Sequence, residues 1–252
     1  MRVARSRSIL PVALVIATVA TACNQGQAIR SQAIADSQAV TFTAQDGVEL
    51  AGRIFGPEGA TAGVVLAHML PADQSSWFEF ADRLGGLGYR ALTFDFRGYC
   101  PGGVAGCSKG TKTVAEIDRD VAGAVRYLKM QGVRRIGLVG ASMGGTASLV
   151  VASQPDDAVD AVVTLSAPAS IDGLMAGPDV LQAIAAAKLF LAGNGDAAAA
   201  QSAQMFYDES TAPKRVELLT TSDHGTDMLE GNQAEIARNL IVGWLERYVP
   251  VA

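Results

Sequence analysis

The sequence predicts an α/β fold, a mostly parallel sheet of eight strands with helices on both faces. Short continuous apolar runs alternate with longer helix-like blocks along most of the chain, and the first two strand-like runs flank a hairpin signal, Asp46-Gly47. A chain of 252 residues that is 49% hydrophobic and 18% charged can form a large core, which excludes wholesale disorder. The sequence indicates no internal repeat and no second domain.

The expected elements follow one another in a regular order. The strand-like runs cover residues 40–43, 48–55, 63–67, 89–96, 135–140, 159–166, 188–191 and 215–220. The helix-like blocks cover residues 75–87, 113–130, 144–153, 180–187, 197–207 and 231–248. Ser75 or Ser76 is a suitable cap for the first helix, and Thr113 with Glu116 forms a capping box for the second. In such sheets the chemistry gathers at the carboxyl ends of the strands.

The amino-terminal residues have the composition of an export signal. Basic residues without any acidic one precede an apolar run over residues 9–20, and small residues then lead to Cys23. The run is shorter than the roughly 20 residues that span a bilayer. The predicted organisation is a signal peptide at 1–22, a flexible Gln-, Ser- and Ala-rich tether at 23–39, and one folded domain at 40–252.

The predicted processing of the signal peptide depends on Cys23. It resembles the cysteine of a bacterial lipobox, which becomes diacylated at the new amino terminus, although Ala20 stands where Leu or Val is typical. The favoured prediction is therefore a lipoprotein anchored to a bacterial membrane through Cys23 and facing away from the cytoplasm. The alternatives are cleavage that releases a soluble periplasmic or secreted protein, and an uncleaved anchor.

The charge balance excludes one class of partner. The chain has a net charge of −5, and loss of residues 1–22 with their three arginines takes it to −8. Nucleic-acid binding needs a clustered positive face, so no nucleic-acid partner is predicted. Three cysteines are too few for a disulfide scaffold or a four-cysteine zinc site, and neither a metal nor a cofactor is predicted. The oligomeric state stays open.

A candidate nucleophile follows the fifth strand-like run. Residues 140–144 read Gly-Ala-Ser-Met-Gly, a G-x-S-x-G sequence between a predicted strand and a predicted helix, which is the context of a nucleophile elbow. Such a turn raises the hydroxyl of Ser142 above the sheet, at the positive end of the helix. The backbone N–H of Met143 would then point to where an oxyanion forms.

A serine nucleophile needs a base, and the chain has two histidines. His224 follows the last strand-like run and fits the chain order serine, acid, histidine, whereas His68 precedes Ser142. The acid is expected after the seventh run, where Asp196 ends a glycine-rich loop and would orient the imidazole. Asp196 could instead serve only as a helix N-cap, and Asp172 is the alternative acid.

Together these segments resemble the α/β-hydrolase superfamily, and within it the dienelactone-hydrolase-like and small esterase members. The matching segments are His68-Met69-Leu70-Pro71, Asp95-Phe96-Arg97-Gly98, residues 140–145, residues 193–196 and Asp223-His224-Gly225. The resemblance covers about residues 40–250. It implies that the loop after the third strand supplies a second oxyanion donor, here the backbone N–H of Met69, and that His68 anchors that loop. Met69 replaces the commoner glycine and adds an apolar wall to the cleft.

Two further segments shape the expected cleft. Cys100 and Cys107 share one glycine-rich loop, and in an oxidising compartment a disulfide between them is predicted, with two free thiols as the alternative. Asp95 and Arg97 are expected to order the same loop. Residues 167–187 are too few for a lid domain, so the cap is expected to be short or absent, with a modest apolar flap.

The sequence therefore predicts a serine hydrolase that cleaves small to medium carboxylic esters, without a cofactor. The predicted catalytic residues are Ser142, Asp196 and His224, with Met69 and Met143 as oxyanion donors. The same residues would also suit a peptidase, an amidase or a thioesterase, because pocket shape separates these activities. A non-catalytic envelope lipoprotein that binds a ligand is the alternative from another class.

Overall fold

The structure is a computed structural model that describes residues 32–100 and 107–252. The predicted signal peptide, Cys23 and the first part of the predicted tether lie outside the described residues. Residues 32–35, which lie in the range predicted as a flexible tether, are helical, and Ala33 is fully buried. The first strand begins at Gln38, so the folded domain starts upstream of residue 40.

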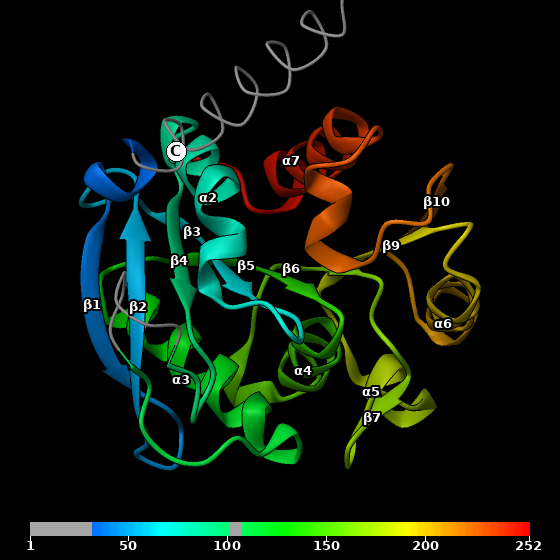
Figure 1. Ribbon diagram of the computed structural model, residues 1–252, viewed down its shortest axis with the longest axis horizontal. Coiled ribbons are helices and arrows are strands. Elements are labelled where there is room, and N and C mark those ends of the chain that lie inside the picture. The colour runs from blue at the N-terminus through cyan, green and yellow to red at the C-terminus, as the bar shows by residue number, and fades with distance from the viewer. Residues whose placement is uncertain (1–31, 101–106) are drawn as a thin grey trace, which may run out of the picture.

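An eight-stranded sheet forms the centre of the molecule, in the order β1-β2-β4-β3-β5-β6-β9-β10 (Figure 1). Its strands are β1 (Gln38–Thr43), β2 (Glu49–Phe55), β3 (Ala62–Ala67), β4 (Arg90–Phe94), β5 (Arg135–Ala141), β6 (Ala161–Leu165), β9 (Ala187–Gly193) and β10 (Lys214–Leu219). The pairs β1–β2 and β2–β4 are antiparallel, and all the other neighbouring pairs are parallel. The predicted mostly parallel sheet of eight strands is confirmed.

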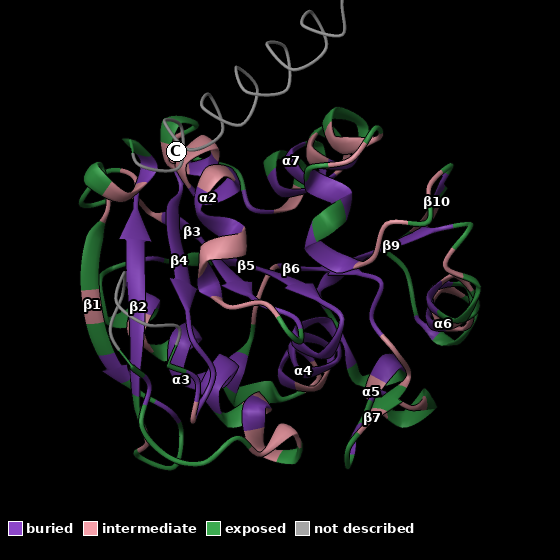
Figure 2. Cartoon of the chain, in the orientation of Figure 1, coloured by how far each residue is buried: buried purple, intermediate pink, exposed green. Residues whose placement is uncertain are grey.

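Helices cover both faces of this sheet. The α-helices of the described chain are α2 (Phe78–Gly86), α3 (Ile117–Met130), α4 (Met143–Ala152), α5 (Pro178–Ala183), α6 (Ala197–Glu209) and α7 (Ala234–Tyr248). The 3₁₀ turns are η1 (Gln74–Trp77), η2 (Val114–Glu116), η3 (Pro155–Asp157) and η4 (Gly225–Leu229). Helices α3 to α6 pack on one hydrophobic cluster, and α2 and α7 pack on the other. The central strands are consequently buried on both sides (Figure 2).

Two predicted helix caps are wrong. Asp73, rather than a serine, caps the first helical segment, because its carboxylate accepts a hydrogen bond from the N–H of Ser75 at 2.8 Å. Thr113 makes no capping hydrogen bond with its side chain at the start of η2. The carboxylate of Glu116 accepts from the guanidinium of Arg97 at 2.9 Å instead, and a charged donor is the stronger partner.

The segment between β6 and β9 is short, as predicted, and forms no lid domain. It contains a hairpin of β7 (Ser170–Ile171) and β8 (Leu174–Met175), followed by α5. In the range expected to form an apolar flap, Leu174, Leu181 and Ile184 are buried in the core, whereas Met175 is largely exposed, at 65%. The hairpin and α5 lie beside α4 and α6 (lower right of Figure 1), so this segment mainly completes the core.

Candidate active site

Ser142 lies in a strained turn between β5 and α4. Its backbone has φ +47° and ψ −119°, a conformation that side chains with a Cβ rarely adopt. Its N–H donates to the carbonyl oxygen of Leu165 at the end of β6, at 2.8 Å. Its own carbonyl accepts from the N–H groups of Gly145 and Thr146 in the first turn of α4. The G-x-S-x-G sequence thus forms the sharp turn that was predicted for it.

The first turn of α4 lies directly against the end of β3. A Cβ on Gly144 would lie 2.5 Å from the carbonyl oxygens of Ala67 and His68, so this position requires glycine. The N–H of Met143, at the first position of α4, has no acceptor within the helix. This close approach therefore places an unpaired helical donor next to the loop that carries Met69.

A hydrogen bond of 2.6 Å joins Nδ1 of His224 to Oδ2 of Asp196. The other carboxylate oxygen of Asp196 accepts from the N–H of Ala199 at 3.4 Å and caps α6. One oxygen of the Asp196 carboxylate thus binds the imidazole of His224, and the other caps α6. The alternative acid, Asp172, is exposed at the turn of the β7–β8 hairpin.

Three loops meet at the carboxyl ends of the parallel strands. A Cβ on Gly225, the residue after His224, would collide with the thioether of Met69 and lie 3.3 Å from the Cβ of Ala141. The residues next to His224 and Ser142 are therefore in contact with each other and with the Met69 loop. The predicted site residues that follow strand ends on this one edge are Met69, Ser142, Met143, Asp196 and His224.

Within the described ranges, no group of three or more His, Cys, Asp or Glu residues is arranged to hold a metal ion. In the same ranges, no helix has both the length and the apolar character needed to cross a bilayer.

His68 is a buried structural residue. Its Nδ1 lies 3.0 Å from the carbonyl oxygen of Met69, and its Nε2 accepts from the N–H of Phe96 at 3.2 Å. These partners assign the proton to Nδ1. Burial lowers the pKa of His68 to about 4, so the ring is neutral at neutral pH. The ring also packs against Phe96 and Tyr99, and it ties the Met69 loop to the loop after β4 in the anchoring role that the resemblance implied.

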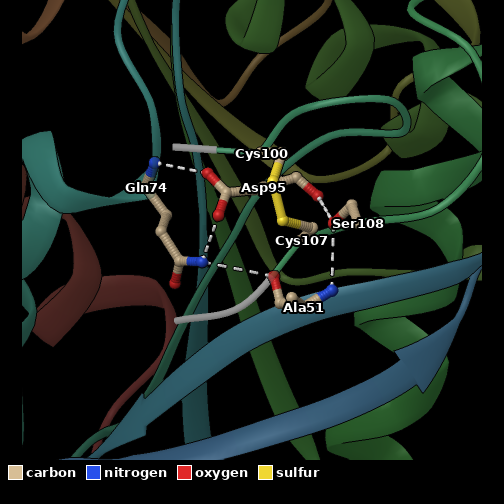
Figure 3. Close-up of a disulfide and its surroundings, with 6 residues drawn as sticks. All are labelled: Ala51, Gln74, Asp95, Cys100, Cys107 and Ser108. Atoms are coloured by element: carbon tan, nitrogen blue, oxygen red, sulfur yellow. Dashed lines mark hydrogen bonds between the residues drawn. A yellow bond between two sulfur atoms is a disulfide. The ribbon is translucent and has the colours of Figure 1, made fainter. Parts of the chain in front are cut away.

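A buried polar network holds the loop after β4, and no sequence motif singles out its partner Gln74. The carboxylate of Asp95 accepts from the backbone N–H and the side-chain amide of Gln74, at 3.0 and 2.5 Å (Figure 3). The Ser108 hydroxyl donates to the carbonyl oxygen of Asp95 at 2.6 Å and accepts from the N–H of Ala51 at 2.9 Å. Burial raises the pKa of Asp95 to about 6.

A disulfide joins Cys100 to Cys107, the pairing that the sequence predicts. Figure 3 shows it beside Asp95 and Ser108. Because Ser108 directly follows Cys107, the bridge closes the loop where the chain is hydrogen-bonded to β2. Residues 101–106 lie outside the described part of the chain.

Arg97 binds the same loop to three other segments of the chain. Its buried guanidinium donates to Asp120 of α3 at 2.7 and 2.9 Å, and to Asp46 of the β1–β2 turn at 2.9 Å. It also donates to Glu116 at 2.9 Å. The guanidinium holds the pKa of Asp46 at about 2. Asp95 and Arg97 therefore order the loop as expected, and the partners of their side chains come from η1, the β1–β2 turn, η2 and α3.

Ser166 is a second strained serine at this edge of the sheet. It is buried, has φ +53°, and its N–H donates to the carbonyl oxygen of Leu191 at 2.8 Å. It directly follows Leu165, the acceptor that holds the turn of Ser142. Sequence reasoning missed this residue, since Ser-Ala-Pro after a strand carries no signal of a positive φ.

Known structures of the same fold include several hydrolases. The esterase Pf2001 of Pyrococcus furiosus is 22% identical to this chain, with a TM-score of 0.69 over 84% of this chain and 91% of the other. The enol-lactonase of Burkholderia xenovorans LB400 is 19% identical, with a TM-score of 0.67 over 81% and 99%. The dienelactone hydrolase of Anabaena variabilis is 20% identical, with a TM-score of 0.67 over 85% and 99%. Likeness at this level of identity establishes the fold.

A curated relative matches a shorter part of the sequence. The uncharacterized protein YfhR of Salmonella typhi is 30% identical over 119 residues, which are 44% of this chain and 39% of that protein. The match thus spans well under half of that relative. The model of the alpha/beta hydrolase fold family, by contrast, matches residues 64–218, which is more than half of the chain and includes both the turn of Ser142 and Asp196. The chain belongs to the α/β-hydrolase fold family.

Proposed function

We propose that this protein is a serine hydrolase that cleaves small to medium carboxylic esters through an acyl-enzyme on Ser142. The observation that carries the proposal is the hydrogen bond between Asp196 and His224 at the sheet edge where Ser142 lies in its strained turn. A hydroxyl, an imidazole and an orienting carboxylate are the groups that acyl transfer needs. The family and the esterase and lactonase structures of the same fold support hydrolysis.

In the proposed reaction, His224 removes the proton of Ser142 while the serine oxygen attacks the acyl carbon. Asp196 keeps the proton of the imidazole on Nδ1, which leaves Nε2 free to accept. The backbone N–H groups of Met143 and Met69 donate to the oxyanion. His224 then protonates the leaving alcohol, and a water molecule that His224 deprotonates releases the acid and restores Ser142.

The surroundings of the base support small to medium substrates. The side chain of His224 is 43% exposed, and the segment between β6 and β9 packs mainly into the core. A site without a lid domain favours small and medium acyl groups that enter directly from solvent.

Labelling with a fluorophosphonate tests the nucleophile. We expect the wild-type protein to be labelled and Ser142→Ala to remain unlabelled. Ser153→Ala is the matched control, because Ser153 lies at the other end of α4 and hydrogen-bonds only locally, to Val150. Absence of Ser142-dependent labelling would exclude the serine hydrolase.

A substrate panel tests the bond that is cleaved. We expect p-nitrophenyl acetate and butyrate to be hydrolysed with a higher kcat/KM than aminoacyl p-nitroanilides and long-chain esters. Faster turnover of the anilides would replace the esterase with a peptidase or amidase, and faster turnover of acyl thioesters would replace it with a thioesterase.

We also propose that the protein is exported and anchored through a lipid on Cys23. The support is the composition of residues 1–23, together with the Cys100–Cys107 disulfide, which needs an oxidising compartment. Intact mass of the protein from a bacterial membrane fraction tests this. A mass without acyl chains, or a chain that keeps residues 1–22, would contradict it.

A further inference from the structure

A polar pocket of about 390 Å³ lies at the sheet edge opposite Ser142. The residues that matter in its lining are Gln38, Glu58, Gly59, Arg90, Tyr127 and Gln131. Arg90 is the first residue of β4, whereas Ser142 follows the last residue of β5, and both strands run in the same direction. The pocket is therefore separate from the proposed catalytic edge.

Arg90 is the one cation that lines this pocket, and it is nearly buried, at 8% exposure. Its Nη1 donates to the carbonyl oxygen of Gly56 at 2.8 Å. Within the described chain it forms no ion pair, and Gly56 is the only acceptor found for its five N–H donors. A guanidinium in a pocket that has no carboxylate partner and unused N–H donors is suited to bind an anion.

Arg97 is a buried arginine with a structural role in the same protein, and it differs from Arg90 in its partners. Its side chain is 3% exposed, and its guanidinium forms ion pairs with Asp46, Glu116 and Asp120, at 2.7 to 2.9 Å. Arg90 is buried to a similar degree but has none of these carboxylates. Arg90 lines a pocket, whereas Arg97 lies within a closed network of carboxylates.

The other lining groups set the chemistry of the ligand. Gln38 and Gln131 offer neutral amides, and the ring of Tyr127 is held by stacking on Phe42 at 5.2 Å. Glu58 is exposed, and its carboxylate lies beyond ion-pair distance of the guanidinium. It would accept a hydrogen bond from a hydroxyl or amino group of a ligand whose anionic end binds the arginine.

We propose that this pocket binds a small organic anion, a phosphate or carboxylate that also carries a hydroxyl or amino group. The anionic group binds Arg90 through two parallel N–H···O hydrogen bonds, and the hydroxyl or amino group faces Glu58. Both a free phosphate ester and the headgroup of an anionic lipid have this chemistry.

Titration calorimetry of the purified protein with glycerol 3-phosphate tests the site. We expect saturable binding of one equivalent, weakened at least tenfold in Arg90→Gln. The matched control is Arg134→Gln, since Arg134 is exposed just before β5, at the same edge of the sheet, and does not line the pocket. Wild-type protein that binds neither glycerol 3-phosphate nor vesicles that contain phosphatidylglycerol, or equal affinities of Arg90→Gln and Arg134→Gln for the ligand that binds, would overturn the proposal.

A second variant keeps the test independent of the stability of Arg90→Gln. Glu58→Gln removes an exposed like charge, so we expect it to bind inorganic phosphate several-fold more tightly than the wild-type protein does. Unchanged or weaker phosphate binding would contradict the site. Vesicles of phosphatidylglycerol in phosphatidylcholine distinguish the two sources. Arg90-dependent binding to vesicles but not to glycerol 3-phosphate would assign a lipid headgroup, and the reverse a free ligand; either result supports the anion site.

Discussion

The thioether of Met69 lies against Gly225, at the position that any Cβ there would occupy. Gly225 has φ +56°, so both its backbone and its neighbour require glycine. This apolar contact joins the predicted oxyanion loop to the loop of His224. The spacing between a proposed oxyanion donor and the proposed base is thus set by a sulfur atom packed on a glycine.

Gly225→Ala should lower kcat/KM for p-nitrophenyl acetate by more than tenfold, because the new methyl group displaces either Met69 or the loop of His224. Met69→Ala removes the thioether, so the double variant should recover part of that loss, and the backbone strain of about 1 kcal/mol should remain. A double-mutant cycle measures this coupling. Additive losses would show that the two side chains do not compete for the same space.

Asp196→Asn should reduce kcat by roughly 10³- to 10⁴-fold, because an amide no longer holds the imidazole in the required tautomer. Asparagine is still a good N-cap, so the free energy of unfolding should change by less than about 1 kcal/mol. Steady-state kinetics and urea denaturation measure the two effects separately. Asp172→Asn is the control, and an equal loss of kcat in that variant would reassign the acid.

Buried His68 should make the protein less stable in acid. Its pKa is about 4 in the folded state, whereas an unfolded histidine titrates near 6.5. Between these values the unfolded chain binds a proton that the folded chain does not, so the free energy of unfolding falls as the pH drops from about 6.5 to 4. Urea denaturation at several pH values should show a shallower fall for His68→Asn.

Asp95 changes the pH dependence of stability in the direction opposite to that of His68. Its pKa is raised to about 6 in the folded state. Its contribution to stability increases as the pH falls from about 6 towards 4. The effect of His68 is therefore measured as the difference in unfolding free energy between His68→Asn and the wild-type protein at each pH. Parallel curves for the two proteins would contradict the assignment.

Replacing both Cys100 and Cys107 by serine should cost roughly 2 kcal/mol of unfolding free energy, because the disulfide closes a short loop. Wild-type protein measured in a thiol reductant should show the same loss of stability. The double variant should be unaffected by reductant, which makes it the control for other effects of the thiol. A wild-type protein whose stability does not respond to reduction would contradict the bridge.

Local signals made most of the site predictable. The turn of Ser142 is encoded by glycines within two residues of it, and the β1–β2 hairpin by Asp46-Gly47. Parallel strands end on one edge of the sheet, so a position just after a strand is informative, and this makes Asp196 and His224 candidates from the sequence.

The parts that escaped prediction depend on contacts that are distant in sequence. Gln74 and Asp95 are 21 residues apart, and only the packed fold brings them together. The capping box of Thr113 fails because Glu116 meets the guanidinium of Arg97, 19 residues away. The positive φ of Ser166 is imposed by its surroundings, because serine itself has no preference for it.

The first described residues are fixed to β2 by a set of contacts with Arg53. Ala33 is fully buried, and the guanidinium of Arg53 in β2 donates to the carbonyl oxygen of Ile34 at 3.0 Å and to the hydroxyl of Ser37 at 2.7 Å. From Gln38 onward, β1 is hydrogen-bonded to β2 along its whole length. A mechanical load applied to the chain ahead of residue 32 would therefore act first on the Arg53 contacts and on the β1–β2 hydrogen bonds at the edge of the sheet, and only through them on the strands that precede Ser142 and His224.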